Sequence, residues 1–214
     1  MMTLLHDFAT ANSRPPRRII FFRDGVAHNQ FEAVTQEEVA KVRRACHAVC
    51  GHSMPQLVFI VTQMRTKARL AEWGRGKGGE GWQNVPPGTI VDRDITGAGV
   101  FDWYMVPHHA LQGSARASHY HVLENDAHLT ADELQRFSFD LCHLYGRATK
   151  IVSRPAHLYY AHLAAALGPY YSAGYKERDA DEWDLHSTSS HSSNRSTSAR
   201  QDLHPNVVRR VYYA

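Results

Sequence analysis

The sequence has few cysteines, no long hydrophobic run and little imbalance of charge. Cys46, Cys50 and Cys142 are the three cysteines among 214 residues. So small and odd a number excludes a framework of paired disulfides and indicates a reducing compartment. No apolar run approaches the roughly 20 residues of a membrane-spanning helix, and the N-terminus lacks a signal-peptide pattern. We therefore expect no membrane partner and a cytoplasmic location, with the nucleus as the alternative.

Global charge says little about a partner. The chain has 24 Lys and Arg against 21 Asp and Glu, a formal charge of +3, which is too small to predict a polyanionic ligand. Fifteen His make the true charge sensitive to pH. A hydrophobic content of 43% is ordinary for a globular protein, and the length suffices for one domain or two small ones.

The apolar run Ile19 to Phe22 predicts a strand over residues 18–23 that is buried on both faces, as in a parallel sheet. Asp24 and Gly25 follow it directly. Ligands of open α/β sheets bind at the carboxyl ends of strands, so Asp24 is a candidate functional residue. The alternative is that Asp-Gly forms a simple turn.

A helix and a second strand are expected next. The run Thr35 to Glu38 has the pattern of a capping box, and Gly51 marks the end of the helix that it would open. Cys46 and Cys50 share a face of this helix, which favours buried thiols over a metal site. Residues 57–62 predict another continuous apolar strand. Strand, helix and strand with short links predict a right-handed parallel crossover.

Cations alternate after the second strand, at Arg65, Lys67 and Arg69. An extended segment would place all three on one side. Such a row is suited either to phosphate contacts or to a solvated sheet edge that resists aggregation. Residues 74–81 contain five glycines and predict a flexible loop.

Further strands are expected over residues 89–92, 100–106 and 118–124, with a polar loop over 108–116. His119 and His121 would point the same way, as metal ligands or as a hydrogen-bonded sheet face. A capping box from Thr130 to Glu133 predicts another helix. Its inner side is expected to carry Leu134, Phe137, Leu141, Leu144 and Tyr145.

The segments at the two ends differ from the centre. Residues 1–16 are expected to be the remnant of an upstream segment, ahead of a partial domain over residues 17–171. Residues 157–167 predict a helix that ends at Gly168 and Pro169. Residues 172–204 are rich in Ser and charged residues and predict a mobile loop, and residues 205–214 predict a C-terminal tail that docks back.

Several stretches together resemble a known family. They are residues 18–26, 84–89, 112–114 with 119–123, 131–135, 159–163 and the terminus 210–214. In order and spacing they are similar to the C-terminal part of the PIWI domain of eukaryotic Argonaute proteins. The resemblance implies an α/β, RNase H-like fold, a mixed sheet flanked by helices, here with its first strands missing.

The family loads a small guide RNA that pairs with a target in RNA-mediated gene silencing. Its slicing members cut the target with a carboxylate-rich tetrad that binds two Mg²⁺ or Mn²⁺ ions. The resemblance matches Asp24 and His162 to two catalytic, metal-binding members of that tetrad. The other two precede the first strand in the family and have no match here. We therefore expect an RNA-binding fragment that cannot cleave alone.

Two alternatives remain at this stage. The chain is a guided endoribonuclease if upstream sequence or a partner supplies the missing carboxylates, or a module for tryptophan-bearing protein partners. The resemblance also implies contacts with guide phosphates or riboses at eight positions. They are Arg69, His108, Arg116, Tyr145, Arg147, Lys150, Ser153 and Tyr159. Lys150 stands where the family commonly has Arg, so an ammonium group replaces a guanidinium that could bind a phosphate through two hydrogen bonds. Leu167 begins a stretch that replaces an Arg-containing run, so we expect weak capture of the guide 5′ phosphate.

Overall fold

A five-stranded mixed sheet forms the centre of the first of two units in this computed structural model, which describes residues 1–76 and 79–171. The first unit is Met1–Leu158, and the second begins at Tyr159. The expected loop over 172–204 and tail over 205–214 lie outside the described residues. No helix of the described part combines the length and hydropathy needed to cross a bilayer.

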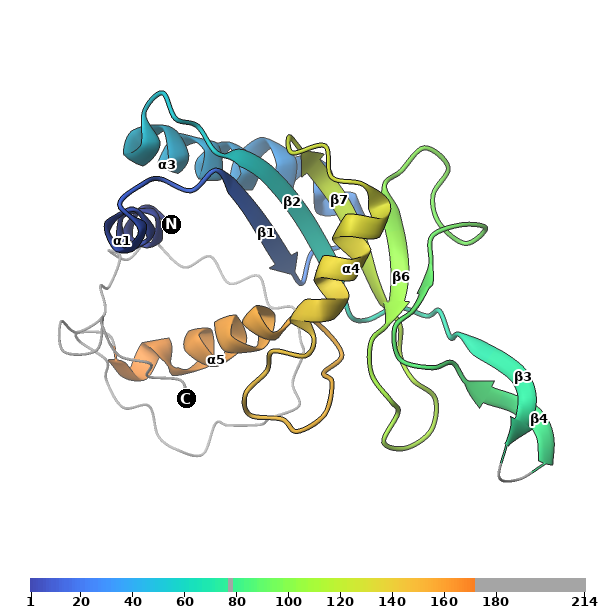
Figure 1. The fold of residues 1–214 in the computed structure, drawn as a ribbon. Coiled ribbons are helices and arrows are strands. Elements are labelled where there is room, and N and C mark those ends of the chain that lie inside the picture. Colours follow the sequence, from blue (N-terminus) through green and yellow to red (C-terminus); the bar gives the residue numbers. More distant parts are fainter. Residues whose placement is uncertain (77–78, 172–214) are drawn as a thin grey trace. The chain divides into compact units, whose positions relative to one another are not determined.

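The order of strands in the sheet is β1-β2-β7-β6-β5 (Figure 1). They are β1 Arg18–Asp24, β2 Gln56–Gln63, β7 Ser118–Asn125, β6 Asp102–Val106 and β5 Thr89–Val91. β1 and β2 are parallel, as the strand–helix–strand pattern of the sequence predicted. β7 is antiparallel to β2, β6 to β7 and β5 to β6. The sheet is therefore mixed, as expected.

Strand β2, whose residues 57–62 are buried, supplies side chains to two hydrophobic cores. Leu57, Phe59 and Val61 lie in the core that also contains Leu5 of α1 and Val42 of α3. The alternating residues Val58 and Ile60 lie in the opposite core, with Leu134 of α4. Because successive strand residues face opposite sides, helices cover both faces of the sheet (Figure 1). In the first unit these helices are α1 Met2–Asn12, α2 Phe31–Val34, α3 Ala40–Cys50 and α4 Ala131–Leu141. Helix α5, Ala156–Tyr171, lies mostly in the second unit.

The first strand is less buried than predicted. Only Phe22 of β1 is buried, and the other residues of the strand are partly or fully exposed. Among the described strands β1 pairs with β2 alone, so it is an edge of the sheet. The apolar run identified a strand correctly but not its position in the sheet.

The helical run between β1 and β2 begins before the predicted capping box. A short helix η1, His28–Gln30, leads through α2 and the π-helical η2, Thr35–Val39, into α3. Thr35 lies inside this run, and its Oγ1 donates to the Phe31 carbonyl at 2.9 Å. The prediction that Thr35 opens the helix was wrong, because a helical Thr satisfies its hydroxyl within the preceding turn. The end at Gly51 is confirmed.

The glycine-rich segment forms a hairpin instead of a flexible loop. β3 Ala71–Gly76 pairs with β4 Gly79–Asn84. Trp73 and Trp82 lie opposite each other, with ring centroids 5.4 Å apart in an edge-to-face contact. Such cross-strand aromatic pairs stabilise hairpins, which explains why the glycine-containing residues on either side of 77–78 pair as strands.

The last two helices match their predicted starts better than their predicted ends. The α4 capping box is confirmed: Thr130 Oγ1 accepts from Glu133 N at 3.3 Å, and Glu133 Oε2 accepts from Thr130 N at 2.8 Å. However, Phe137 is 39% exposed, and Leu144, 65% exposed, lies beyond the end of the helix. α5 continues through the predicted stop at Gly168 to Tyr171.

A charged cluster fastens α3 to the far end of β7. Arg43 Nη1 and Nη2 donate to the two carboxylate oxygens of Asp126 at 2.9 and 3.1 Å, and Nη2 also donates to Glu124 at 3.2 Å. Leu57 N donates to Asp126 Oδ2 at 3.3 Å. The hydrogen bond from Arg43 is the main cause that lowers the pKa of Asp126.

We expect Asp126→Asn to lower the free energy of unfolding by about 1 kcal/mol at pH 7, because the pair is partly exposed. The pKa of Asp126 is lower in the folded state. The stabilisation is therefore present above the ordinary carboxyl pKa and is lost as pH falls through the lowered one. Urea unfolding from pH 7 to pH 2.5 should show the difference between variant and parent shrinking toward zero. Asp7→Asn, on the exposed side of α1, is the control; an equal and pH-independent effect in both variants would contradict the assignment.

Candidate functional site

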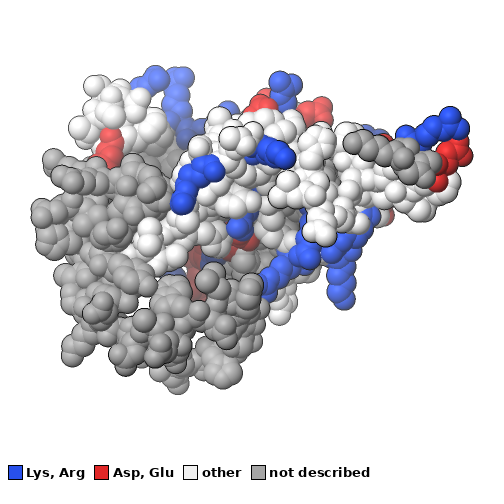
Figure 2. Space-filling model, turned by 90° about the horizontal axis from the view of Figure 1, so that it is seen from below, with Lys and Arg blue, Asp and Glu red and all other residues white. Residues whose placement is uncertain are grey.

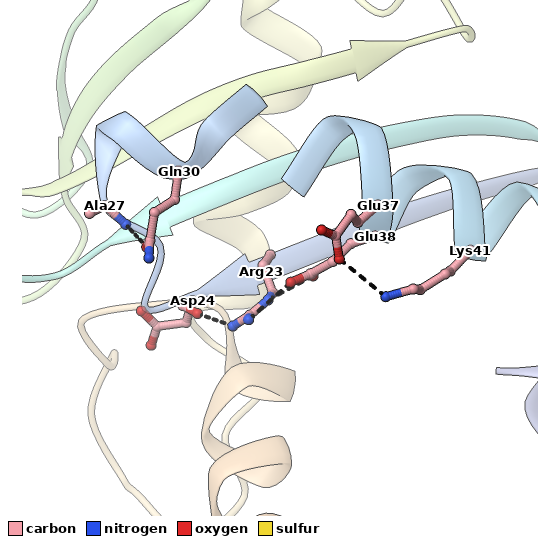
Figure 3. Close-up of polar contacts among 7 residues, drawn as sticks. All are labelled: Arg23, Asp24, Ala27, Gln30, Glu37, Glu38 and Lys41. Atoms are coloured by element: carbon pink, nitrogen blue, oxygen red, sulfur yellow. Dashed lines mark hydrogen bonds and ion pairs between the residues drawn. The ribbon is translucent and has the colours of Figure 1, made fainter. Parts of the chain in front are cut away.

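Asp24 lies at the carboxyl end of β1, where its neighbour Arg23 anchors the strand (Figure 3). The guanidinium of Arg23 pairs with both carboxylate oxygens of Glu38, through Nε at 2.9 Å and Nη2 at 3.2 Å. Its Nη1 donates to the Asp24 backbone carbonyl at 2.5 Å. Glu38 belongs to η2, so this bidentate ion pair between Arg23 and Glu38 fixes the end of β1 to the helical run.

The Asp24 carboxylate pairs with an arginine from far along the sequence. Arg154 Nη1 donates to Asp24 Oδ2 at 2.5 Å, and the side chains of Arg154 and Asp24 are 20% and 13% exposed. In the sheet, Asp24 pairs in register with Thr62, which pairs with Tyr120. Thr62 and Tyr120 are both fully buried. The carboxylate therefore lies in a largely enclosed position beside a cation.

His162, the second predicted tetrad residue, belongs to the second unit. It is exposed on α5. The predicted guide-binding Tyr159 is on the same helix and is half-buried. The two units are described separately, so a meeting of His162 with Asp24 stays a prediction.

Exposed cations line two neighbouring segments of the first unit. In residues 64–70 exposure alternates, and Arg65, Lys67 and Arg69 are the exposed residues. Arg116 is likewise exposed between two buried alanines. Thr66 Oγ1 donates to the Ala117 carbonyl at 2.8 Å, which holds the two segments side by side. Seen from below, Lys and Arg side chains project in several groups from the described part, with fewer acidic side chains between them (Figure 2).

An asparagine clamps the loop that carries Arg116. Asn84 Nδ2 donates to the Gly113 carbonyl at 2.9 Å, and Asn84 Oδ1 accepts from Ala115 N at 2.8 Å. Gly113 has a φ of 68°, a conformation that favours glycine. The family-matched residues Asn84 and Gly113 therefore shape one loop, and Arg116 projects from a backbone that is held in place.

The other predicted guide contacts have varied surroundings. Arg69 Nη1 donates to the carbonyls of Thr66 and Ala68, at 3.0 and 2.9 Å, so its guanidinium folds back on its own segment. His108 is half-buried, and burial together with His109 lowers its pKa. An imidazole that is neutral at pH 7 offers a phosphate a hydrogen bond but no charge.

A third segment, residues 142–155, follows α4. Tyr145 is half-buried there, and Arg147 and Lys150 are exposed. Ser118 Oγ at the start of β7 donates to the Ser153 carbonyl at 2.9 Å. This hydrogen bond joins the third segment to the sheet at Ser118, two residues after Arg116.

Comparison with known proteins identifies the family. A family model described as "Piwi domain" matches residues 1–172. The chain belongs to the Piwi domain family. It is 42% identical to Protein argonaute 7 of Arabidopsis thaliana over 168 residues, which are 78% of this chain and 16% of that protein. It is also 42% identical to Protein argonaute MEL1 of Oryza sativa subsp. japonica over 173 residues, which are 80% of this chain and 16% of that protein. The chain thus spans about a sixth of these relatives.

Solved structures confirm the RNase H-like α/β fold of this Piwi-domain chain. The C-terminal lobe of a budding yeast Argonaute superposes with a TM-score of 0.68 and 32% identity, and the match covers 78% of this chain and 36% of that one. Kluyveromyces polysporus Argonaute with a guide RNA gives the same TM-score and identity, over 78% of this chain and 20% of that one.

The Piwi family is typically dependent on divalent metal ions. The described residues around Asp24 do not fit the expected pair of Mg²⁺ or Mn²⁺ ions. Such hard cations need several oxygen ligands. In the first unit Asp24 is the carboxylate that the family resemblance selects, and one of its oxygens accepts a hydrogen bond from Arg154. The described residues of this Piwi domain contain a different cluster with metal-ligand spacing, formed by Asp102, His119 and His121.

Sequence reasoning missed two partners in this Piwi domain. Arg154 was not selected as a functional residue, although it pairs with Asp24. Asp102 was not selected, although its Oδ2 lies 2.6 Å from His119 Nε2. Asp102 opens β6 and pairs in register with His121, and this register between two separate strands cannot be read from the sequence.

Proposed function

We propose that this Piwi-domain chain binds a small guide RNA and its complementary target through their phosphates, and does not cleave by itself. The row of exposed cations Arg65, Lys67 and Arg116, on segments joined by the Thr66–Ala117 hydrogen bond, carries this proposal. Arg147 and Lys150 extend the cationic surface from the segment that Ser153 joins to the sheet. Binding of tryptophan-bearing partners stays a prediction.

Backbone recognition has measurable consequences. Contacts with phosphates release counterions, so affinity falls steeply with salt, whereas base sequence has little influence. Arg116 contributes through its exposed position on a clamped backbone. Arg69 contributes after its guanidinium leaves the carbonyls of Thr66 and Ala68. Lys150 contributes a single ammonium charge.

We expect the double variant Arg116→Ala/Arg147→Ala to bind single-stranded guide RNA about tenfold more weakly at 0.15 M salt. Loss of two phosphate contacts should reduce the slope of log affinity against log salt by about 1.4. Fluorescence anisotropy with a labelled 5′-phosphorylated guide of several sequences measures both quantities.

The matched control is Arg44→Ala/Arg136→Ala, which removes the same charge from exposed positions on α3 and α4. It should change the affinity by less than about twofold. Equal losses of affinity in the two double variants would show that only the net charge of the chain matters. An unchanged affinity in Arg116→Ala/Arg147→Ala would show that the cationic surface is not the binding site.

Guided cleavage is the second candidate function, favoured by the position of Asp24 at the carboxyl end of a strand. It requires further carboxylates from elsewhere, because two ions cannot be held by one carboxylate that is paired with Arg154. The chain is incubated with guide, matched target and Mg²⁺. We expect intact target; a single cut that disappears in Asp24→Ala would establish the second function instead of the first.

A further inference from the structure

A carboxylate and two imidazoles converge on one face of the sheet, at a place that the proposed RNA surface does not use. Asp102 of β6 pairs in register with His121 of β7, and His119 is two residues away on β7, so all three side chains share a face. Tyr120, between the two His, points to the opposite core. Thr62, which pairs in register with both Tyr120 and Asp24, shares that opposite side. The cluster and Asp24 are therefore on different faces of the sheet.

The ligand atoms are close enough to share one ion. One ligand atom from each of Asp102, His119 and His121 lies within 4.8 Å of the others. The rings of His119 and His121 have centroids 3.8 Å apart. Asp102 Oδ2 lies 2.6 Å from His119 Nε2, and its other oxygen accepts from Gly97 N at 3.3 Å.

His121 is the residue that protein contacts leave unexplained. It is 4% exposed, and within the described residues neither ring nitrogen has a hydrogen-bond partner. Buried polar atoms are normally satisfied, because desolvation without a partner is unfavourable. A buried ring nitrogen of this kind, within 4.8 Å of ligand atoms of His119 and Asp102, is what a metal ion satisfies.

The cluster opens on a cavity of about 220 Å³, lined also by His28, Gln63 and Ile95. This volume is enough for a bound water at an open coordination position. Burial is the main cause that lowers the pKa of His121, to about 4, and that of His119.

We propose that Asp102, His119 and His121 form a binding site for one divalent transition metal ion of the zinc class, with a fourth position open to the cavity. Two imidazoles and one carboxylate are a common ligand set for Zn²⁺. His119 Nε2 takes part once its proton has moved to Nδ1, and the Gly97 amide keeps Asp102 oriented. Hard ions such as Mg²⁺ are not expected here, since they prefer oxygen ligands.

The test is titration of the purified, chelator-treated full chain with Co²⁺, followed by competition with Zn²⁺. We expect one equivalent with the visible absorption of tetrahedral Co²⁺, displaced by Zn²⁺, and a Zn²⁺-dependent rise in the melting temperature. His121→Phe, which fills the space without a ligand atom, should lower Co²⁺ affinity at least about 100-fold and abolish the rise.

A control separates the site from the other His residues. His47→Ala, exposed on α3, should leave Co²⁺ binding unchanged. If His121→Phe does not fold by circular dichroism, His119→Asn replaces it with the same expectation. Absence of a one-to-one complex in the parent chain, or equal binding in parent and His121→Phe, would overturn the proposal and leave a His–Asp pair with a structural role. Neither result affects the RNA-binding proposal, because none of the substituted residues lies in the cationic surface.

Discussion

Phe59→Ala is expected to lower the free energy of unfolding by about 3–5 kcal/mol. Phe59 has no exposed surface, lies near the middle of the interior strand β2 and stacks on Phe21 with ring centroids 4.8 Å apart. Removal of the ring loses its transfer free energy and leaves a cavity that a sheet packed on both faces cannot close. Urea unfolding followed by circular dichroism measures the difference.

The matched control is Phe137→Ala on α4. The same chemical change is made there at a side chain that is 39% exposed, so we expect a loss of less than about 1.5 kcal/mol. If the two variants lose equal stability, the core between β2 and the helices is not packed as described. If Phe59→Ala does not fold at all, Phe59→Leu should still lose measurably more than Phe137→Leu.

The strands could be predicted because their signals are local. The apolar run of β2 is continuous, and the structure shows why: its alternate residues Phe59 and Ile60 enter two different cores. β1 has an equally apolar run, yet it is an edge among the described strands. Burial depends on which strands become neighbours, and that information is not contained in the run itself.

The errors concern features that depend on distant or competing contacts. Thr35 matched a capping box, but its hydroxyl bonds to the preceding turn of a helix that had already begun. The hairpin of β3 and β4 depends on the pairing of Trp73 with Trp82. A prediction based only on the number of glycines does not take this pair into account. Local propensity is overridden in both cases by contacts that form only in the folded chain.

The candidate site divides in the same way. Alternation alone predicted the exposed row that contains Arg65 and Lys67. The hydrogen bond from Thr66 to Ala117, which places Arg116 beside that row, joins residues 51 positions apart. Asp24 could be selected from its place after a strand, whereas its partner Arg154 is 130 positions away. The spacing of residues predicts which side chains a segment exposes on one side. It does not predict which distant segment will pack beside it.

Arg154→Met is expected to lower the free energy of unfolding by about 3 kcal/mol, because it leaves the enclosed Asp24 carboxylate without its cation. The double variant Asp24→Asn/Arg154→Met should be more stable than the sum of the single losses predicts, by a coupling free energy of about 2 kcal/mol. Thermal and urea unfolding of the parent, both single variants and the double variant measure this coupling.

Arg147→Met, on the same segment but exposed, is the control and should change stability by less than about 0.5 kcal/mol. The coupling also bears on catalysis, since any cation that binds the Asp24 carboxylate must displace Arg154. At 1.4 kcal/mol per tenfold, a coupling of about 2 kcal/mol weakens such binding by about 30-fold. Should Arg154→Met behave like Arg147→Met, that barrier would vanish and Asp24 would be accessible to metal ions in the parent chain. The expectation that this Piwi domain does not cut RNA by itself would then lose the support of the Asp24–Arg154 pair, whereas RNA binding by the cationic surface would be unaffected.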